Sequence, residues 1–348
     1  MKKKATIVDI ANKLGITPSA VSKALSGHPR ISDETKLAVI AAAKALEYTP
    51  NHMAMGLRKG TSGLIGILVP AIHYSFFATA IKGAEEVLSQ AGYNVIIAQS
   101  KDNAALERKQ LEGLVRAQVE GIIASMAIET KDFSFYQELS FDIPLVLFDR
   151  TFEDDNVSTV IVDDFAGAVK AVDHLVEMGY SRIAHLGGYA HILPFGKRIE
   201  GYKSALAKHG LPFRKEYLFQ CAPNKDEGAQ ATERLLQLPE PPDAIFAASD
   251  YLAFGAIKAA KKQGLHVPDD LGLVGFSNEE FSAQVSPSIT SVDQFSEAMG
   301  ASAAELLVRQ MREGKGGKEF IAQKRILSPK LIARESSLRK VKTTLHTP

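Results

Sequence analysis

The sequence predicts a small N-terminal unit made only of helices, followed by a large α/β body with two lobes. Two observations predict this division. Three short segments with helical spacing and capping residues occupy the first 48 positions, and from Gly63 onward β-rich runs alternate with helical stretches in two successive series. Strand–helix alternation implies parallel sheets wrapped by helices, and two such series imply two lobes with a cleft between them.

Composition and cysteine usage are typical of a soluble globular protein from a reducing compartment. Apolar residues make up 45% of the 348 positions and charged residues 23%, and this length favours two or three domains. Cys221 is the only cysteine, so no internal disulfide can form. The basic residues 1–4 are not followed by an apolar run, and no stretch of about 18 apolar residues occurs. We therefore expect a cytoplasmic protein that is not inserted in a membrane and binds no metal.

Charge is distributed unevenly along the chain. Residues 1–60 contain ten basic and four acidic side chains, whereas the other 288 residues contain 31 basic and 36 acidic ones. A basic N-terminal unit on a mildly acidic body is typical of a segment that binds nucleic acid. Charge alone leaves open a solvated helical surface that happens to be rich in lysine.

The first two helices are marked by their caps. Thr6 can cap the first helix with Asp9 three residues later, and Gly15 ends it. Thr17 can cap the second helix, and Pro18 then occupies the first helical position, where a missing N–H does no harm. Two helices joined by a short turn that contains glycine form a helix-turn-helix.

A third helix follows, and the second helix exposes short polar side chains. Ser32 caps the third helix, whose apolar positions are Leu37, Val39, Ile40, Ala43 and Leu46. The exposed face of the second helix carries Ser19, Ala20, Ser22 and Lys23. Small hydroxyls and a lysine suit close approach to phosphates and base edges. A plain three-helix bundle without DNA contacts remains the alternative on geometry alone.

Residues 49–59 form a short potential helix with little core-forming pattern. Met53, Met55 and Leu57 have polar neighbours and cannot anchor it alone, and a helix of this length is marginal in isolation because nucleation is costly. Such a segment makes sense if it folds on DNA and inserts an apolar wedge into the minor groove.

Residues 5–63 resemble the N-terminal signature of the LacI/GalR family of bacterial transcription regulators. Many positions agree at fixed spacing and in the same order: Thr6-Ile7-Val8-Asp9-Ile10-Ala11, Gly15-Ile16-Thr17, Ala20-Val21-Ser22-Lys23-Ala24-Leu25-Ser26 and Tyr48-Thr49-Pro50-Asn51. The resemblance implies a recognition helix in the major groove, a contact from the following loop, and a hinge helix whose leucine enters the minor groove. The predicted DNA-binding residues are Thr6, Thr17, Pro18, Ser19, Ala20, Ser22, Lys23, Arg30, Asn51, Ala54 and Leu57.

Two of these residues depart from the family's pattern. Many members have a polar or aromatic side chain where this chain has Pro18, and proline donates no hydrogen bond to a base. Lys23 replaces a common arginine, and lysine lacks the fork that binds guanine through two hydrogen bonds. We therefore expect the preferred base sequence to differ from that of other members.

The body resembles the family's core, which looks like a periplasmic sugar-binding protein. Its predicted strands are Leu64–Val69, Asn94–Gln99, Gly121–Ser125, Pro144–Phe148, Ser158–Val162, Arg182–Leu186, Ala244–Ala248 and Leu271–Phe276. Its predicted helices cover about 76–91, 104–117, 166–178, 197–209, 227–237 and 251–263. The predicted domains are a reader at 1–49, a hinge at 50–62, a core at 63–340 and a tail at 341–348. Within the core we expect an N-terminal lobe of about 63–162 and 293–325, and a C-terminal lobe of about 163–292 and 326–340.

Ligands of open α/β sheets bind beyond the carboxyl ends of the strands. The predicted effector-binding residues lie just there: His73, Phe76, Phe77, Asp149, Arg198, Asp250 and Asn278. Aromatic faces, an arginine, carboxylates and an amide suit a polar small molecule with many hydroxyls. Each residue also has a structural alternative: the phenylalanines can be core, Asp149 can pair with Arg150, and Asp250 can cap its helix.

Two further positions bear on the effector. Arg198 begins an Arg-x-x-Gly-aromatic motif, and the resemblance implies that this arginine contacts the effector; Asp250 matches a second motif on the effector side. Many members carry an aspartate where this chain has Ser277. Asn278 can replace the lost acceptor, or the effector can itself be anionic.

The chain contains no Gly-x-Ser-x-Gly, Walker A, Gly-x-Gly-x-x-Gly or metal-ligand pair, so we expect neither an enzyme nor a bound cofactor. We predict a repressor of carbohydrate-metabolism genes that binds double-stranded, near-palindromic operator DNA as a homodimer and is switched by a sugar or sugar derivative. It would work at the bacterial nucleoid. Residues 339–348 have no leucine heptads, so a tetramerising coiled coil is not expected there. A nucleobase-responsive regulator is the alternative within the family, and a solute-binding protein for sugar uptake is the alternative from another class.

Overall fold

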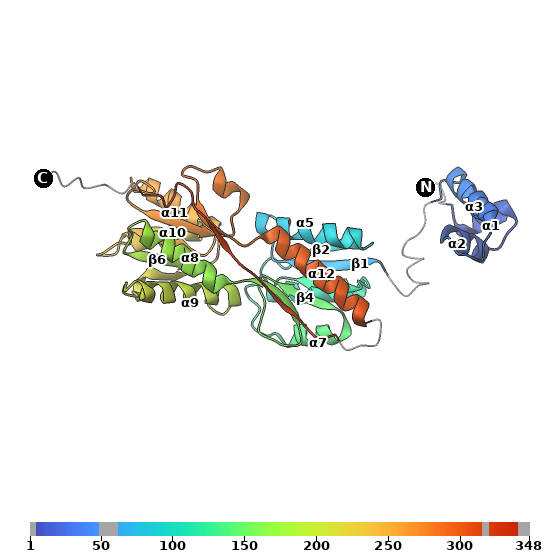
Figure 1. Cartoon of the computed structure of the whole chain (residues 1–348), viewed down its shortest axis with the longest axis horizontal. Coiled ribbons are helices and arrows are strands. Elements are labelled where there is room, and N and C mark those ends of the chain that lie inside the picture. Colours follow the sequence, from blue (N-terminus) through green and yellow to red (C-terminus); the bar gives the residue numbers. More distant parts are fainter. Residues whose placement is uncertain (1–4, 49–61, 315–319, 340–348) are drawn as a thin grey trace. The chain divides into compact units, whose positions relative to one another are not determined.

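The computed structural model describes residues 5–48, 62–314 and 320–339. The chain divides into two compact units, which are residues 1–62 and 63–348, and each is described by itself (Figure 1). The predicted hinge residues Asn51, Ala54 and Leu57 lie outside the described residues.

The N-terminal unit, here called the head, contains helices α1 (Ile7–Leu14), α2 (Pro18–Leu25) and α3 (Asp33–Ala45). All three predicted caps are confirmed. Thr6 and Asp9 form a capping box, and Gly15 ends α1 in the left-handed conformation with φ of 67°. Thr17 caps α2 directly before Pro18, and Ser32 caps α3. The helices enclose a small core built on Ile10, Ala11, Val21, Ala24, Val39, Ala42 and Ala43.

The prediction for the apolar positions of α3 is only half right. Val39 and Ala43 are buried, but Leu37 is 68% exposed and Ile40 is 54% exposed. An amphipathic helix buries one stripe of its surface, and in α3 that stripe consists of Val39, Ala42 and Ala43. Leu37 and Ile40 lie outside this stripe. Apolar residues all round α3 therefore hide the direction of its core face in the sequence.

The body contains two six-stranded sheets that define its two lobes. The N-lobe sheet has the order β11-β5-β4-β3-β1-β2, and its strands are β1 (Leu64–Val69), β2 (Asn94–Gln99), β3 (Gly121–Ala124), β4 (Leu145–Phe148), β5 (Ser158–Val162) and β11 (Lys324–Leu327). The C-lobe sheet has the order β12-β10-β9-β8-β6-β7, and its strands are β6 (Ile183–Gly187), β7 (Leu218–Gln220), β8 (Ala244–Ala247), β9 (Gly272–Phe276), β10 (Thr290–Asp293) and β12 (Lys330–Ile332). Within the described part of the chain, neighbouring strands of both sheets pair in parallel, except β10 with β12, which pair antiparallel.

Helices cover both faces of each sheet, as a parallel sheet requires. In the N-lobe, α5 (Ser75–Gln90) and α12 (Ser296–Gly314) pack together over one face, while α6 (Ala104–Arg116) and α7 (Ser134–Asp142) cover the other. In the C-lobe, α8 (Asp164–Glu177) and α9 (Leu193–Lys208) lie opposite α10 (Lys225–Leu236) and α11 (Asp250–Lys262). Strand β1 has apolar side chains on both faces, which require cover from both sides. Ile65, Ile67 and Val69 point to the α5 side, and Leu68 points to the α6 side.

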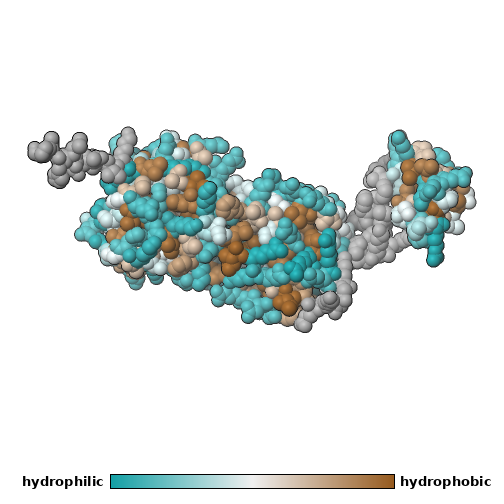
Figure 2. All heavy atoms as spheres, viewed as in Figure 1, coloured by the Kyte–Doolittle hydropathy of each residue, from teal (hydrophilic) through white to brown (hydrophobic). Residues whose placement is uncertain are grey.

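Three segments connect the lobes. The chain passes from β5 to α8, from β10 back to α12, and from β11 to β12, so each lobe is built from separated stretches of sequence (Figure 1). On the face drawn in Figure 2, hydrophobic surface of the body is broken up by hydrophilic residues. In the described part of the chain, no helix is long and apolar enough to cross a membrane.

All eight predicted strands and six predicted body helices are present; β1, β2 and β5 have the predicted bounds, and the other elements are shifted at one or both ends. The largest shift is in α9, which begins at Leu193 instead of near 197, because Pro194 is accepted in the first turn of a helix. Two helices and four strands, which are α7, α12, β7, β10, β11 and β12, are not predicted from the sequence. Three of the four strands, β7, β11 and β12, lie at sheet edges and are partly exposed, so they lack the buried apolar run that marks the equally short β3, β4 and β8.

Candidate DNA interface and ligand cavity

The outer face of α2 is the candidate DNA interface of the head. Pro18, Ser19 and Lys23 are exposed on it, whereas Ala20 and Ser22 are half-buried. Val21 and Ala24 turn to the core and fix the helix, so the exposed residues stand on a rigid support. Arg30 is exposed in the loop that leads to α3.

Two predicted DNA-binding residues also have structural tasks. The hydroxyl of Thr17 accepts a hydrogen bond from the backbone N–H of Ala20 at 3.2 Å, and it keeps its proton for another acceptor. The Thr6 hydroxyl donates to the Asp9 carboxylate at 2.7 Å. Thr6 therefore holds the start of α1 together, and its proton is already used.

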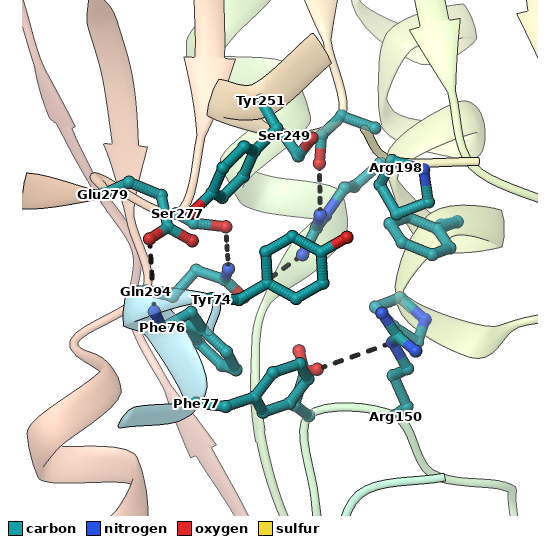
Figure 3. Close-up of a pocket in the computed structure, with 15 residues that line it drawn as sticks. Tyr74, Phe76, Phe77, Arg150, Arg198, Ser249, Tyr251, Ser277, Glu279 and Gln294 are labelled. Carbon is teal, nitrogen blue, oxygen red and sulfur yellow. Dashed lines mark hydrogen bonds and ion pairs between the residues drawn. The ribbon is translucent and has the colours of Figure 1, made fainter. Parts of the chain in front are cut away.

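A cavity of about 50 Å³ lies between the two lobes of the body. This volume is below the roughly 300 Å³ at which small-molecule pockets begin, so a ligand fits only if the side chains or lobes that line the cavity move. Its lining residues come from the carboxyl ends of strands and the helix starts that follow them (Figure 3): Tyr74, Phe76, Phe77, Asp149, Arg150, Pro194, Phe195, Arg198, Pro223, Ala248, Ser249, Tyr251, Ser277, Glu279 and Gln294.

Arg198 is the most constrained cation of the cavity. Only 3% of it is exposed, and its guanidinium lies 3.7 Å from the centre of the Phe276 ring. Its Nε donates to Asp164 at 2.8 Å, and its terminal nitrogens donate to the Ala248 carbonyl at 2.6 Å and to Gln294 at 3.2 Å. A guanidinium has five donors, so most of them are committed to the protein before any ligand binds.

The carboxyl groups near Arg198 are held in low-dielectric surroundings. Burial raises the pKa of Asp164 to about 7, although the adjacent Arg198 acts in the opposite direction. Burial also raises the pKa of Asp149, against the lowering effect of Arg150 and Arg198. Asp149 itself has a left-handed backbone with φ of 56°, directly after β4.

Arg150 is the second buried cation. It is 5% exposed and forms an ion pair with Asp102, and its Nε lies 4.0 Å from the Asp149 carboxylate. The guanidinium lies 5.6 Å from the centre of the Phe77 ring. Both arginines of the cavity are therefore neutralised by carboxylates of the protein itself.

Aromatic rings form much of the cavity wall. Phe76 and Phe77 meet edge to face with ring centres 5.1 Å apart. Tyr74 from the N-lobe meets Tyr251 from the C-lobe in the same manner, at 4.9 Å. Figure 3 shows the Tyr74 ring reaching into the middle of the group of side chains.

The structure brings four of the seven predicted effector residues to the cavity: Phe76, Phe77, Asp149 and Arg198. The other three lie elsewhere. His73 is exposed and packs on Tyr74 with ring centres 4.3 Å apart. Asn278 donates to Asp293 and accepts from Arg334, next to a separate groove beside α5.

Asp250 is fully buried beneath the cavity wall. It accepts hydrogen bonds from the backbone N–H of Glu279 and from the hydroxyls of Ser282 and Ser291, each at 2.7 Å. Burial raises its pKa to about 7. Its helix is capped by the neighbouring Ser249, so Asp250 positions the loop after β9 instead of capping α11.

Several cavity residues are absent from the sequence-based set. Tyr74, Arg150 and Tyr251 each stand next to a predicted residue, so strand-end position was a usable signal for them. Gln294 follows β10, a strand that the sequence analysis does not predict. Among the described residues, no group of three histidine, cysteine or acidic side chains could hold a metal ion.

A capped helix-turn-helix followed by two α/β lobes around a cavity defines a ligand-responsive DNA-binding regulator. Family models agree with this class: residues 6–51 match "Bacterial regulatory proteins, lacI family" and residues 172–337 match "Periplasmic binding protein-like domain". The chain belongs to the lacI family of bacterial regulatory proteins and is a DNA-binding transcription regulator, as the sequence resemblance predicts.

Similar proteins extend over nearly the whole chain. The catabolite control protein A of Priestia megaterium is 33% identical over 310 residues, which are 88% of this chain and 93% of that protein. The ribose operon repressor of Halalkalibacterium halodurans is 33% identical and covers 95% of this chain and 97% of its own. A solved structure, a complex of the transcriptional regulator CelR with cellobiose, superposes with a TM-score of 0.72 at 27% identity over 95% of this chain and 99% of that one.

Proposed function

We propose that this protein is a repressor of carbohydrate-metabolism genes, controlled by a sugar or sugar derivative in the cavity between the lobes. The observation that supports this most is the balance of charge in the cavity. Arg198 and Arg150 are already paired with Asp164 and Asp102, so the cavity offers little free positive charge to an anion. This balance favours a neutral ligand.

The other lining groups suit a molecule with several hydroxyls. Asp149 offers carboxylate oxygens as acceptors, and Ser249 and Tyr251 offer hydroxyls. Aromatic walls can pack against the apolar faces of a sugar ring. They can also stack on a nucleobase, which keeps a nucleobase-responsive regulator as the second candidate. The relatives named for ribose and cellobiose support the sugar.

A thermal-shift screen of neutral sugars, uronates, sugar phosphates and nucleobases tests the ligand class. We expect a neutral sugar to raise the melting temperature and the Arg198→Ala variant to lose that shift. Lys203→Ala, on the exposed side of α9, serves as the control and should keep it. A shift retained in Arg198→Ala would place the ligand elsewhere.

In the proposed complex with DNA, two heads read the half-sites of a near-palindromic operator. Pro18, Ser19 and Lys23 would face the major groove, and Leu57, which lies outside the described residues, would enter the minor groove. Leu57→Ala should then weaken operator binding more than about tenfold, or about 1.4 kcal/mol, and leave ligand binding unchanged. Equal operator affinity would exclude intercalation by Leu57.

Homodimer formation is supported by the free edge of the N-lobe sheet. Strand β2 lies at that edge, and Ile97 on it is 48% exposed. An apolar side chain on an unpaired edge strand invites pairing with a second chain. We place this regulator in the cytoplasm at the nucleoid, without catalytic activity, because its family consists of transcription regulators.

A further inference from the structure

Helix α5 of the N-lobe begins without a cap of its own. Tyr74 occupies the N-cap position with an extended backbone, and its side chain makes no capping hydrogen bond. The first N–H groups of a helix have no partner within the helix and carry partial positive charge. In this helix a partner comes from another part of the chain.

That partner is a carboxylate of the opposite lobe. Glu279 follows β9 in the C-lobe and is 6% exposed. Its Oε2 accepts a hydrogen bond from the backbone N–H of Phe76 at 3.2 Å (Figure 3) and another from the Ser75 hydroxyl. Burial raises the pKa of Glu279, although these two hydrogen bonds and one from the Ser75 backbone act in the opposite direction.

The C-lobe holds Glu279 rigidly in this position. The backbone N–H of Glu279 donates to the buried Asp250 at 2.7 Å. The two residues before it, Ser277 and Asn278, have positive φ angles of 108° and 50°, directly after β9. The positive φ of Ser277 is unfavourable for a residue with a side chain. It occurs two residues before Glu279, whose carboxylate reaches α5.

A second contact joins the lobes at the same helix end. The Tyr251 ring of α11 packs against Tyr74, and a hydrogen bond links Tyr251 with the backbone of Ser75. Glu279 and Tyr251 therefore both hold the first turn of α5 from the C-lobe. Both also line the ligand cavity, so this contact lies beside the space that a ligand enters.

We propose that Glu279 is an interlobe latch, whose carboxylate serves as the missing N-cap of α5 and keeps the two lobes closed. Separation of the lobes removes the side-chain acceptors that the C-lobe provides to this helix, of which Glu279 is the charged one. Closure is thus stabilised even before a ligand binds, and loss of the latch shifts the body toward an open form. The latch does not depend on which ligand the cavity binds.

Interlobe distances in the full-length protein test the latch. Spin labels are placed at Phe141→Cys on α7 and Ser204→Cys on α9, both exposed, in a Cys221→Ser background. The labelled chain is diluted with unlabelled chain, and distances are measured by pulsed electron resonance without ligand. Glu279→Ala should shift the distribution to longer distances, and Glu279→Gln, which keeps an acceptor without the charge, should shift it less.

Hydrogen exchange at the start of α5 gives a second readout. Loss of a cap corresponds to roughly 2- to 30-fold faster exchange of the first amides. Glu280→Ala is the matched control, because Glu280 is the exposed neighbour, and it should change neither readout. An unchanged distance distribution in Glu279→Ala would overturn the proposal.

A new N-cap placed on α5 itself tests whether Glu279 holds the lobes together or only stabilises this one helix. Tyr74→Asn combined with Glu279→Ala is compared with Tyr74→Ala combined with Glu279→Ala, so that the aromatic ring is missing from both. Asparagine should restore slow exchange in α5, because it is a good N-cap residue, while the lobes stay open in both variants. If asparagine also restored the short distance, Glu279 would act on α5 alone and the latch would be refuted.

Discussion

Replacing Arg198 with methionine removes the guanidinium but keeps an apolar stem of similar length. Asp164 then loses its cation in a site where it is 6% exposed, and the Ala248 carbonyl loses its donor. Loss of one partner from a buried ion pair costs about 3–5 kcal/mol, a large part of the about 5–15 kcal/mol that stabilises a domain. We expect this cost at pH 8.5, where the wild-type carboxyl is ionised.

The cost should fall at low pH, because burial raises the pKa of Asp164 to about 7. At pH 5.5 the carboxyl is protonated with or without Arg198, and only unmade hydrogen bonds remain, at about 1–3 kcal/mol. Urea unfolding followed by circular dichroism at both pH values measures the difference. Asp164→Asn added to Arg198→Met should recover stability at pH 8.5. A cost below about 1 kcal/mol at pH 8.5, or an equal cost at both pH values, would refute this description of the pair.

Three further predictions concern the head, the C-lobe and the sheet edge. Lys23→Ala should weaken binding to all DNA sequences and reduce the salt slope of binding by about one, whereas Lys44→Ala on α3 should not, as DNA titrations at several salt concentrations would reveal. Asp250→Asn should flatten the pH dependence of stability: burial raises the pKa of Asp250 to about 7, so its contribution is full below about pH 4 and is lost as pH rises through 7. Urea unfolding across that range would contradict this if the free energy of unfolding changed equally with pH in the wild-type protein and in Asp250→Asn. Ile97→Asp should convert dimers to monomers in sedimentation, whereas Phe141→Asp, 81% exposed on α7, should not; dimers in both would exclude the β2 edge.

The sequence predicts best those elements whose local chemistry is complete. Thr6 with Asp9, Gly15, and Thr17 with Pro18 each specify a helix boundary through a hydrogen bond or a backbone conformation that needs no distant partner. Long buried strands such as β1 are equally clear. Strand β11 is different, because it forms by pairing with β5, more than 160 residues earlier. Its four residues alone contain no pattern that predicts a strand.

The cavity is predictable to the extent that strand ends determine it. Asp149 reaches it from the end of β4, as the strand-end rule indicates, whereas Arg198 reaches it from within α9 and was predicted from its motif. Asp250 stands at an equally suitable position but points beneath the wall, where three donors bind it. Glu279 is not predicted from the sequence, because its role depends on a helix end in the opposite lobe. The residues around it in the sequence give no indication of that contact.

The central claim is that a ligand in the cavity controls DNA binding by the head. Its most direct test is fluorescence anisotropy of labelled operator DNA with the full-length protein, with and without a sugar found by thermal shift. We predict that the sugar changes the operator affinity of the wild-type protein and has no effect on Arg198→Ala, which should still bind operator. Operator affinity that stays the same in the wild-type protein at saturating sugar would contradict the account.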